Sequence, residues 1–395
     1  MKNTIRTILV LLLISAQQLH AQNRSIQFAF GSWDEVKLKA QKESKIIFVD
    51  AFTTWCGPCK WLAKNVFTND TVADFYNSNF INVSIDMEKG QGIELAKQWA
   101  VKAYPTLLFI ASNGEVLHRA CGSMEVAKFV QLGKDALNTE TQFATAQKKY
   151  ESGKADIKFL AAYVLQLQDN CMAFQKERDA YFSTQKEADL LSNQNWEIIR
   201  RTLKDIDSRE FKYVESHQAD FSKLYDAKMV NETIDVIYES ALIAPIRKDS
   251  LDNFNSLRAK VLQRNTLAAK KAVANADMAY FKKKKDWDNY IKSTERYIAD
   301  FEPQNWNLLN STAWTLFENI SDKKQLESAL NLAKKSVLLN ENGANIDTYA
   351  NLLFKSGDKK SAVEYEKKAI ELAKKDGDEG LAKELEETLK KFETK

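Results

Sequence analysis

Two cysteines separated by two residues carry the clearest chemical signal in the chain. They are Cys56 and Cys59 in the segment WCGPCK, which directly follows an apolar run typical of a strand. If Pro58 begins a helix, the unpaired N–H groups and the dipole at its start stabilise a thiolate on Cys56. A thiolate attacks disulfides, so Cys56 would form a mixed disulfide that Cys59, one turn further on, resolves. Gly57 keeps the approach to the sulfur open.

Two other roles remain open for this cysteine pair, a structural disulfide and half of a zinc site. Zinc needs further ligands, and the remaining candidates are His118, His217, Cys121 and Cys171. His118 and Cys121 lie three residues apart on an expected strand, where their side chains point to opposite faces. A purely structural bridge does not require a strand-to-helix junction, so the position of the pair favours redox chemistry.

The elements that must position the pair alternate between strand and helix signals. Apolar β-branched runs predict buried strands, and the Asn113–Gly114 turn predicts a hairpin between the last two. Ser32 with Glu35 predicts a capping box at the first helix, and Ser123 is expected to cap the last one. The predicted strands are 45–52, 80–86, 106–110 and 115–121, with helices before, between and after them. This order predicts an α/β fold with a mixed sheet flanked by helices.

Several matched positions make residues 26–137 resemble the thioredoxin family. Besides the CGPC motif, Asp50 lies six residues before Cys56, where the family keeps a buried acid beneath the cysteine pair. Tyr104-Pro105-Thr106 matches the loop whose proline is cis in the family. Gly122 matches the glycine that borders the substrate groove.

The resemblance implies a role for each matched residue. Asp50 would have a raised pKa and accept the proton of Cys59, the alternative being a strand-end aspartate satisfied by backbone or water. The backbone of Tyr104 would pair with a substrate strand. The residues implied in substrate binding are Trp55, Gly57, Pro58, Tyr104, Pro105 and Gly122.

Three residues depart from the classical family pattern. Phe52 replaces a second tryptophan, Lys64 replaces a helix-kinking proline, and Asn82 replaces a lysine near the buried acid. The stretch 66–75 is more similar to extracytoplasmic thioredoxin-like domains that receive electrons from membrane reductases.

The other two cysteines are interpreted as packing residues. An unpaired cysteine most often fills an apolar position, so Cys121 is expected to fill a place in a strand. Cys171 is expected to be a buried helix residue. By the resemblance Cys121 falls on the rim of the substrate groove, where a third thiol that modulates or traps disulfides is one alternative. A bridge between Cys121 and Cys171 is the other, and it depends on a distance that the sequence does not give.

The first 21 residues read as a secretory signal peptide. Lys2 and Arg6 precede the apolar run Ile8–Ile14, and Ala21 is the small residue expected before cleavage. The run is too short to span a bilayer comfortably, and the alternative is an uncleaved anchor. The processed protein is therefore expected to be periplasmic or otherwise exported, without a membrane span. A net charge of +3 gives no reason to expect nucleic acid as a partner.

The pattern of the rest of the chain predicts helices. Only 12 glycines and four prolines occur in 395 residues, and Ala, Leu, Lys and Glu dominate after residue 138. Residues 328–339 and 361–372 repeat at an offset of 33, a period similar to that of tetratricopeptide helix pairs. The expected organisation is a signal peptide at 1–21 and a thioredoxin-like domain at 22–138. An unassigned helical region at 139–265 and tetratricopeptide-like repeats at 266–395 follow.

These features predict an exported thiol-disulfide oxidoreductase that reduces or isomerises protein disulfides and serves redox homeostasis. Cys56 and Cys59 form the redox centre, with no other cofactor and no metal. The expected partners are disulfide-bonded client proteins, an electron-donating membrane or envelope reductase, and a protein bound by the helical repeats. The alternative is a helical-repeat scaffold or chaperone in which the thioredoxin-like domain is an adaptor.

Overall fold

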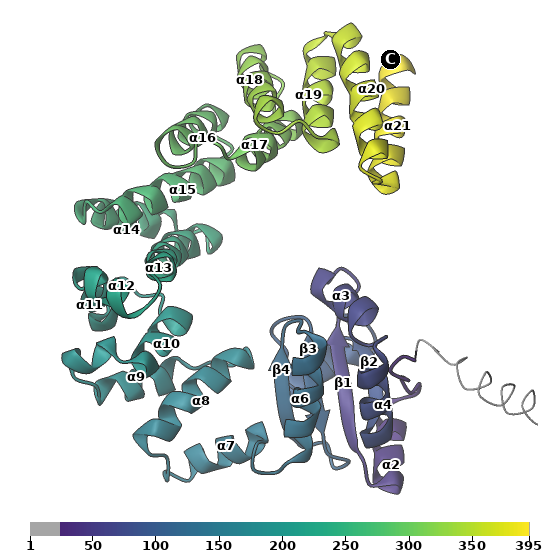
Figure 1. Cartoon of the computed structure of the whole chain (residues 1–395), viewed down its shortest axis with the longest axis vertical. Coiled ribbons are helices and arrows are strands. Elements are labelled where there is room, and N and C mark those ends of the chain that lie inside the picture. The colour runs from purple at the N-terminus through teal and green to yellow at the C-terminus, as the bar shows by residue number, and fades with distance from the viewer. Residues whose placement is uncertain (1–23, 395) are drawn as a thin grey trace, which may run out of the picture. The chain divides into compact units, whose positions relative to one another are not determined.

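The computed structural model describes residues 24–394, so the predicted signal peptide lies outside the described residues. The chain divides into two compact units, the first ending at Thr202 and the second beginning at Leu203. The first holds the sheet and the helices around it, and the second is all helical (Figure 1).

A four-stranded sheet in the order β2-β1-β3-β4 forms the centre of the first unit. Strand β1 (Ile46–Phe52) runs parallel to β2 (Phe80–Asp86) and antiparallel to β3 (Thr106–Ile110), which pairs antiparallel with β4 (Val116–Cys121). Strands β1 and β3 are almost continuously apolar because both of their faces are covered by helices. The predicted mixed sheet flanked by helices is confirmed.

Two apolar cores lie on opposite faces of this sheet. The helices that cover it are α2 (Trp33–Glu43), α3 (Gly57–Asn65), α4 (Asp70–Asn79), α5 (Gly92–Gln98) and α6 (Val126–Leu137). Helices α2 and α5 pack Trp33 and Leu95 against Val49 on one face. On the other face α3, α4 and α6 enclose Phe48, and Tyr76 stacks on Phe129 with ring centroids 4.4 Å apart.

One of the two predicted helix caps is confirmed and the other is wrong. The capping box of Ser32 and Glu35 is present at the start of α2. The cap predicted at Ser123 is wrong, because α6 begins at Val126 with Glu125 at its N-cap and no side-chain hydrogen bond there. Gly122 has a φ of +86°, and the chain turns away from the sheet before the helix starts.

Further helices follow in the first unit, and the first of them packs along the free edge of β4. They are α7 (Phe143–Glu151), α8 (Ile157–Asp169), α9 (Gln175–Ser183), the 3-10 helix η1 (Glu187–Leu191) and α10 (Asn193–Thr202). The Phe143 backbone N–H donates to His118 Nδ1 at 3.0 Å, and Lys148 pairs with Glu115 at 2.7 Å. Burial lowers the pKa of His118 to about 4, so this ring stays neutral and can accept the bond.

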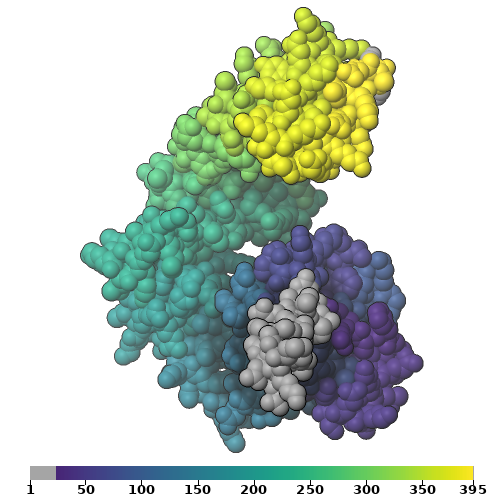
Figure 2. All heavy atoms as spheres, turned by 45° about the vertical axis from the view of Figure 1, so that its right-hand side comes forward, coloured from purple at the N-terminus to yellow at the C-terminus, as the bar shows by residue number. Residues whose placement is uncertain are grey.

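The second unit consists of helices packed in sequence order. They are α11 (Arg209–Ser216), α12 (Gln218–Leu224), α13 (Ala227–Arg247), α14 (Leu251–Gln263), α15 (Leu267–Lys284), α16 (Trp287–Phe301), α17 (Trp306–Asn319), α18 (Lys323–Leu339), α19 (Gly343–Ser356), α20 (Lys359–Lys375) and α21 (Glu379–Thr394). The residues that repeat at an offset of 33 lie on α18 and α20. Figure 2 shows the side chains of the last helices closely packed in yellow. None of the helices in residues 24–394 is long and apolar enough to cross a membrane.

A buried pair of acids lies between α19 and α20. Glu366 is fully buried, and neither of its carboxylate oxygens has a hydrogen-bond donor among the described residues. Asp347 lies next to it and accepts a hydrogen bond from the Asn351 amide at 2.7 Å. Burial first, and then the neighbouring charge of Asp347, raise the pKa of Glu366 well above its ordinary value of 4.5.

The stability of the helical unit should therefore fall as the pH rises above 4.5. A raised folded-state pKa means that the folded chain holds a proton that the unfolded chain has lost, at about 1.4 kcal/mol for each pKa unit. Glu366→Gln keeps the shape and cannot ionise, so we expect its unfolding midpoint to change much less between pH 5 and pH 8. Circular dichroism at 222 nm during urea unfolding of the full chain measures this.

Glu371→Gln, an exposed change on the same helix, is the matched control and should keep the wild-type dependence on pH. If Glu366→Gln loses as much stability as wild type between pH 5 and pH 8, the buried acid is not the cause.

Candidate active site

Cys56 and Cys59 form a disulfide at the start of α3, with their Cα atoms 5.3 Å apart. Cys56 is the N-cap residue of this helix, and its Sγ accepts the backbone N–H of Cys59 at 3.1 Å. The backbone N–H of Cys56 itself donates to the carbonyl of Thr53 at 3.2 Å, which fixes the turn from β1. Once the disulfide opens, the helix N–H groups are placed to stabilise negative charge on the Cys56 sulfur.

The two cysteines differ little in exposure, and both are buried. Cys56 is 2% exposed and Cys59 is 6% exposed. No group of three His, Cys, Asp or Glu residues within 24–394 is arranged to hold a metal ion. The arrangement at Cys56 is therefore that of a disulfide at a helix N-terminus, which can exchange with other disulfides.

Asp50 is a buried carboxyl on β1, the strand that leads into the cysteine turn. It is 6% exposed and lies opposite Ser84 on β2 and Leu107 on β3. The Ser84 hydroxyl donates to Asp50 Oδ2 at 2.8 Å, and Oδ1 has no partner among the described residues. Burial raises the pKa of Asp50 to about 6, against the smaller opposite effect of the Ser84 bond. This carboxyl can therefore take up or release a proton near neutral pH.

The residue next to Asp50 on β2 is Ser84, not the Asn82 that the family pattern singled out. Asn82 is opposite Phe48, and its amide donates to Asn77 at 3.1 Å. Ser84 lies two residues further along the same face of the strand, which places its hydroxyl beside the carboxyl. The strand register decides which residue of β2 faces Asp50. In the sequence Ser84 is one of three polar residues of this strand, and no local signal singles it out.

Four of the residues implied in substrate binding form one side of the site. Trp55 is 64% exposed, its indole N–H donates to Glu88 at 2.9 Å, and its ring meets that of Tyr104 edge to face. The Tyr104–Pro105 peptide bond is cis, as the resemblance implied. The Gly122 N–H donates to the Pro105 carbonyl at 2.8 Å.

A groove of about 610 Å³ lies beside the start of α3. Its lining residues are Gly57, Pro58, Trp61, Ser123, Met124, Glu125 and Lys128. A Cβ atom placed on Gly57 would meet no atom within 4 Å, so the space beside the disulfide is open. Sequence reasoning found Gly57 and Pro58 but missed the other wall. Trp61, three residues after Pro58, lies on α3 with these two residues, and its spacing was the signal available for this residue. The opposite wall, Ser123 to Lys128, depends on how the chain folds after β4.

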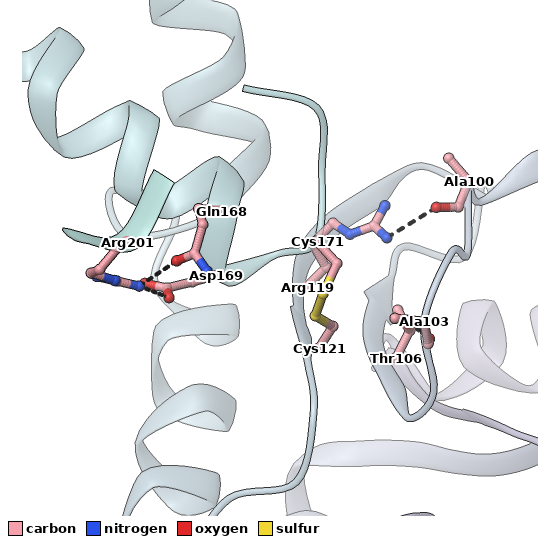
Figure 3. The surroundings of a disulfide bond; sticks show 9 residues. All are labelled: Ala100, Ala103, Thr106, Arg119, Cys121, Gln168, Asp169, Cys171 and Arg201. Carbon is pink, nitrogen blue, oxygen red and sulfur yellow. Dashed lines mark hydrogen bonds and ion pairs between the residues drawn. A yellow bond between two sulfur atoms is a disulfide. The ribbon is translucent and has the colours of Figure 1, made fainter. Parts of the chain in front are cut away.

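The remaining two cysteines form a second disulfide, Cys121–Cys171 (Figure 3). The interpretation of both as unpaired packing residues is wrong, and the alternative of a bridge is correct. Cys171 is also not a helix residue, because it follows the end of α8 with a φ of +53°. The pairing joins residues 50 positions apart, so it depends on how α7 and α8 pack against β4.

Comparisons with known proteins find similarity in the N-terminal part of the chain. A family model for thioredoxin matches residues 31–134. Thioredoxin H1 from Arabidopsis thaliana is 32% identical over 92 residues, which are 23% of this chain and 75% of that protein. Thioredoxin H-type 2 from Nicotiana tabacum is 29% identical, over 28% of this chain and 87% of that protein. A solution structure of a candidate disulphide isomerase from Bacteroides thetaiotaomicron is 47% identical, covering 30% of this chain and 98% of that one, with a TM-score of 0.29.

Asp50→Asn should raise the free energy of unfolding and slow one step of the disulfide exchange. Above pH 6 the folded chain carries an ionised buried carboxylate, so the variant should gain roughly 2–3 kcal/mol at pH 7.5. The gain should vanish below about pH 4, where folded and unfolded chains are both protonated. Release of a mixed disulfide by Cys59 should slow, and attack by Cys56 should keep its rate. Urea unfolding at both pH values and stopped-flow fluorescence measure these effects.

Asp74→Asn, a change of the same kind at a half-exposed position on α4, should leave both quantities near wild type. Equal rates of mixed-disulfide release in wild type and Asp50→Asn would contradict a proton-transfer role for Asp50.

Proposed function

The chain belongs to the thioredoxin family and is a thiol-disulfide oxidoreductase, and we propose that it is exported and reduces or isomerises disulfides of client proteins. The observation that carries this proposal is the Cys56–Cys59 disulfide, with the Cys59 N–H on the Cys56 sulfur, beside an open groove. The pair needs no other cofactor, because the two sulfurs themselves carry the electrons.

The proposed reaction begins with both cysteines reduced. The Cys56 thiolate attacks one sulfur of a client disulfide, forms a mixed disulfide with it, and releases the other client sulfur as a thiolate. Cys59 passes its proton to Asp50 and attacks Cys56 Sγ, which restores the Cys56–Cys59 disulfide and frees the second client sulfur. Two electrons move from the cysteine pair to the client, and the released thiolates take up protons.

Asp50 suits the proton-transfer step because its environment keeps the pKa near neutral. A carboxyl with an ordinary pKa of 3.8 would be a poor acceptor at pH 7, whereas one at about 6 is closer to the optimum for a general base. Ser84, which donates to Asp50, is an exposed residue. It therefore gives the buried carboxyl a route for exchanging its proton with water.

The groove supports a protein client more than a small thiol. Trp61 and Met124 offer apolar contact on opposite walls, and Glu125 and Lys128 offer charges at the edge. The proposed contact of a client strand with the Tyr104 backbone would fix the scissile disulfide over Cys56.

The direction of electron flow depends on a partner. The Gly57-Pro58 dipeptide is similar to that of reducing members of the family, so we propose net reduction or isomerisation. An electron-donating membrane or envelope reductase would then return the Cys56–Cys59 disulfide to the dithiol form.

We propose that the helical second unit recruits a protein partner or client through a tetratricopeptide-like surface. Several large apolar side chains of this unit are more than half exposed, namely Leu224, Val236, Leu267 and Leu338. The same exposed side chains favour the rival function, a binding scaffold or chaperone with an adaptor domain. Retained cellular function after Cys56→Ser would support the rival.

Trapping distinguishes the two functions. Cys59→Ser should accumulate mixed disulfides through Cys56 in the compartment where the protein acts, because nothing resolves them. Wild type should reduce insulin, and Cys56→Ser should do so only at the background rate. Non-reducing electrophoresis with mass spectrometry measures the adducts, and Cys56→Ser/Cys59→Ser is the matched control that should form none. A complete lack of adducts, together with no insulin reduction by wild type, would defeat the proposal.

A further inference from the structure

The Cys121–Cys171 disulfide anchors the end of β4, the strand that continues directly into one wall of the groove. Cys121 is the last residue of β4, and Ser123, Met124 and Glu125 of the groove wall follow after Gly122. Cys171 follows the end of α8, in a part of the first unit outside the region matched by the thioredoxin family. Figure 3 shows the two sulfurs joined at the end of β4, close to Arg119.

Hydrogen bonds also tie this strand end to the loop that precedes Pro105. Cys121 is paired with Thr106, whose hydroxyl donates to the Ala103 carbonyl at 2.7 Å. Two residues earlier, the Arg119 guanidinium donates to the carbonyls of Trp99 at 3.0 Å and Ala100 at 3.4 Å. The end of β4 is therefore held by pairing with β3, by the Arg119 bonds to the loop before Pro105, and by the covalent bond to Cys171.

Residues 122–125 of the groove wall have few hydrogen-bond restraints, and Met124 is the one side chain among them that packs against the apolar core. Residues 122–125 belong to no helix or strand, and no side chain caps the start of α6. Gly122 contributes one backbone hydrogen bond to the Pro105 carbonyl, and its φ of +86° is a conformation that glycine adopts readily. The position of this wall thus depends on the packing of Met124 and on where β4 ends.

Cys171 belongs to a well-fixed segment. Its backbone N–H donates to the Gln168 carbonyl at 3.0 Å, and the next residue, Met172, packs in the apolar cluster of Phe143 and Tyr163. Arg201 on α10 donates to the Gln168 side chain at 2.6 Å and pairs with Asp169 (Figure 3). The disulfide therefore connects a weakly restrained wall to a firmly packed platform.

We propose that Cys121 and Cys171 are positioning residues for client binding, and that their disulfide holds the groove wall in the shape that a protein client requires. This inference rests on the proposed function at Cys56 and Cys59. The second disulfide stays closed during the reaction and exchanges no electrons with the client. Its loss should weaken binding of clients that fill the groove, and it should leave the reaction with small disulfides, which do not need the wall, unchanged.

The test uses the full chain with Cys121→Ser/Cys171→Ser. We expect the KM for insulin to rise roughly 5- to 10-fold with kcat little changed, which is the signature of lost binding shared by ground and transition states. The rate constant with a small aromatic disulfide should stay at the wild-type value. Amide hydrogen exchange of residues 122–128, measured by mass spectrometry, should become faster in the variant.

Lys148→Ala is the matched control, because it removes the ion pair of Lys148 with Glu115, another link between the helices and the β4 region. It should leave the KM and the exchange of 122–128 unchanged. If the serine variant does not fold, Cys121→Val/Cys171→Ala, which keeps apolar side chains at the site, replaces it.

A folded variant with unchanged KM and unchanged exchange would overturn the inference. Equal loss of rate with insulin and with the small disulfide would also overturn it, because the effect would then lie at Cys56 and Cys59. If wild type fails to reduce insulin, the proposed function fails instead, and the hydrogen-exchange measurement still tests whether the disulfide holds the wall.

Discussion

The burial of strand β1 between β2 and β3 is the constraint on which the active site depends. Residues 47–51 are buried, and hydrogen-bonded neighbours on both sides fix the register of the strand. That register places Asp50 opposite Ser84, and a slip by one residue would move the carboxyl to the other face of the sheet. The strand also ends where the Met87 N–H binds the Phe52 carbonyl, so the turn that carries Cys56 begins at a fixed point. Proton acceptor and nucleophile are thus positioned by strand β1 and the turn that follows it.

A raised pKa alone does not identify a functional group in this protein. Asp50 and Glu366 are both buried acids whose pKa is raised mainly by burial. Asp50 has a donor in Ser84 and belongs to the strand that leads to the redox disulfide. Glu366 lies against another acid, Asp347, and belongs to the packing of α19 and α20. The first arrangement permits proton transfer, whereas the second mainly makes stability depend on pH.

Local sequence signals predicted the elements of the sheet and the cysteine pair, since each depends on residues close together in the chain. Apolar runs gave all four strands within about one residue, and the CGPC spacing placed a cysteine at a helix start. The features that the sequence did not predict all involve residues far apart in the chain. The Cys121–Cys171 bond joins β4 to the segment after α8, and the wall from Ser123 to Lys128 faces α3 only after folding. Nothing local distinguishes Ser84 as the partner of Asp50, because that choice is made by the pairing of two strands.

The second disulfide also bears on where the catalytic part of the chain ends. The family match stops at residue 134, and a boundary after residue 138 would separate β4 from the helix that covers its edge. Such a cut would remove the Phe143 N–H from His118 and leave Cys121 as a free thiol beside the groove. An uncovered edge strand can pair with strands of other chains, and a free thiol can form disulfides with them. The first compact unit, which extends to Thr202, avoids both problems. Helices α7 and α8 therefore belong to the catalytic unit physically, although they lie outside the thioredoxin match.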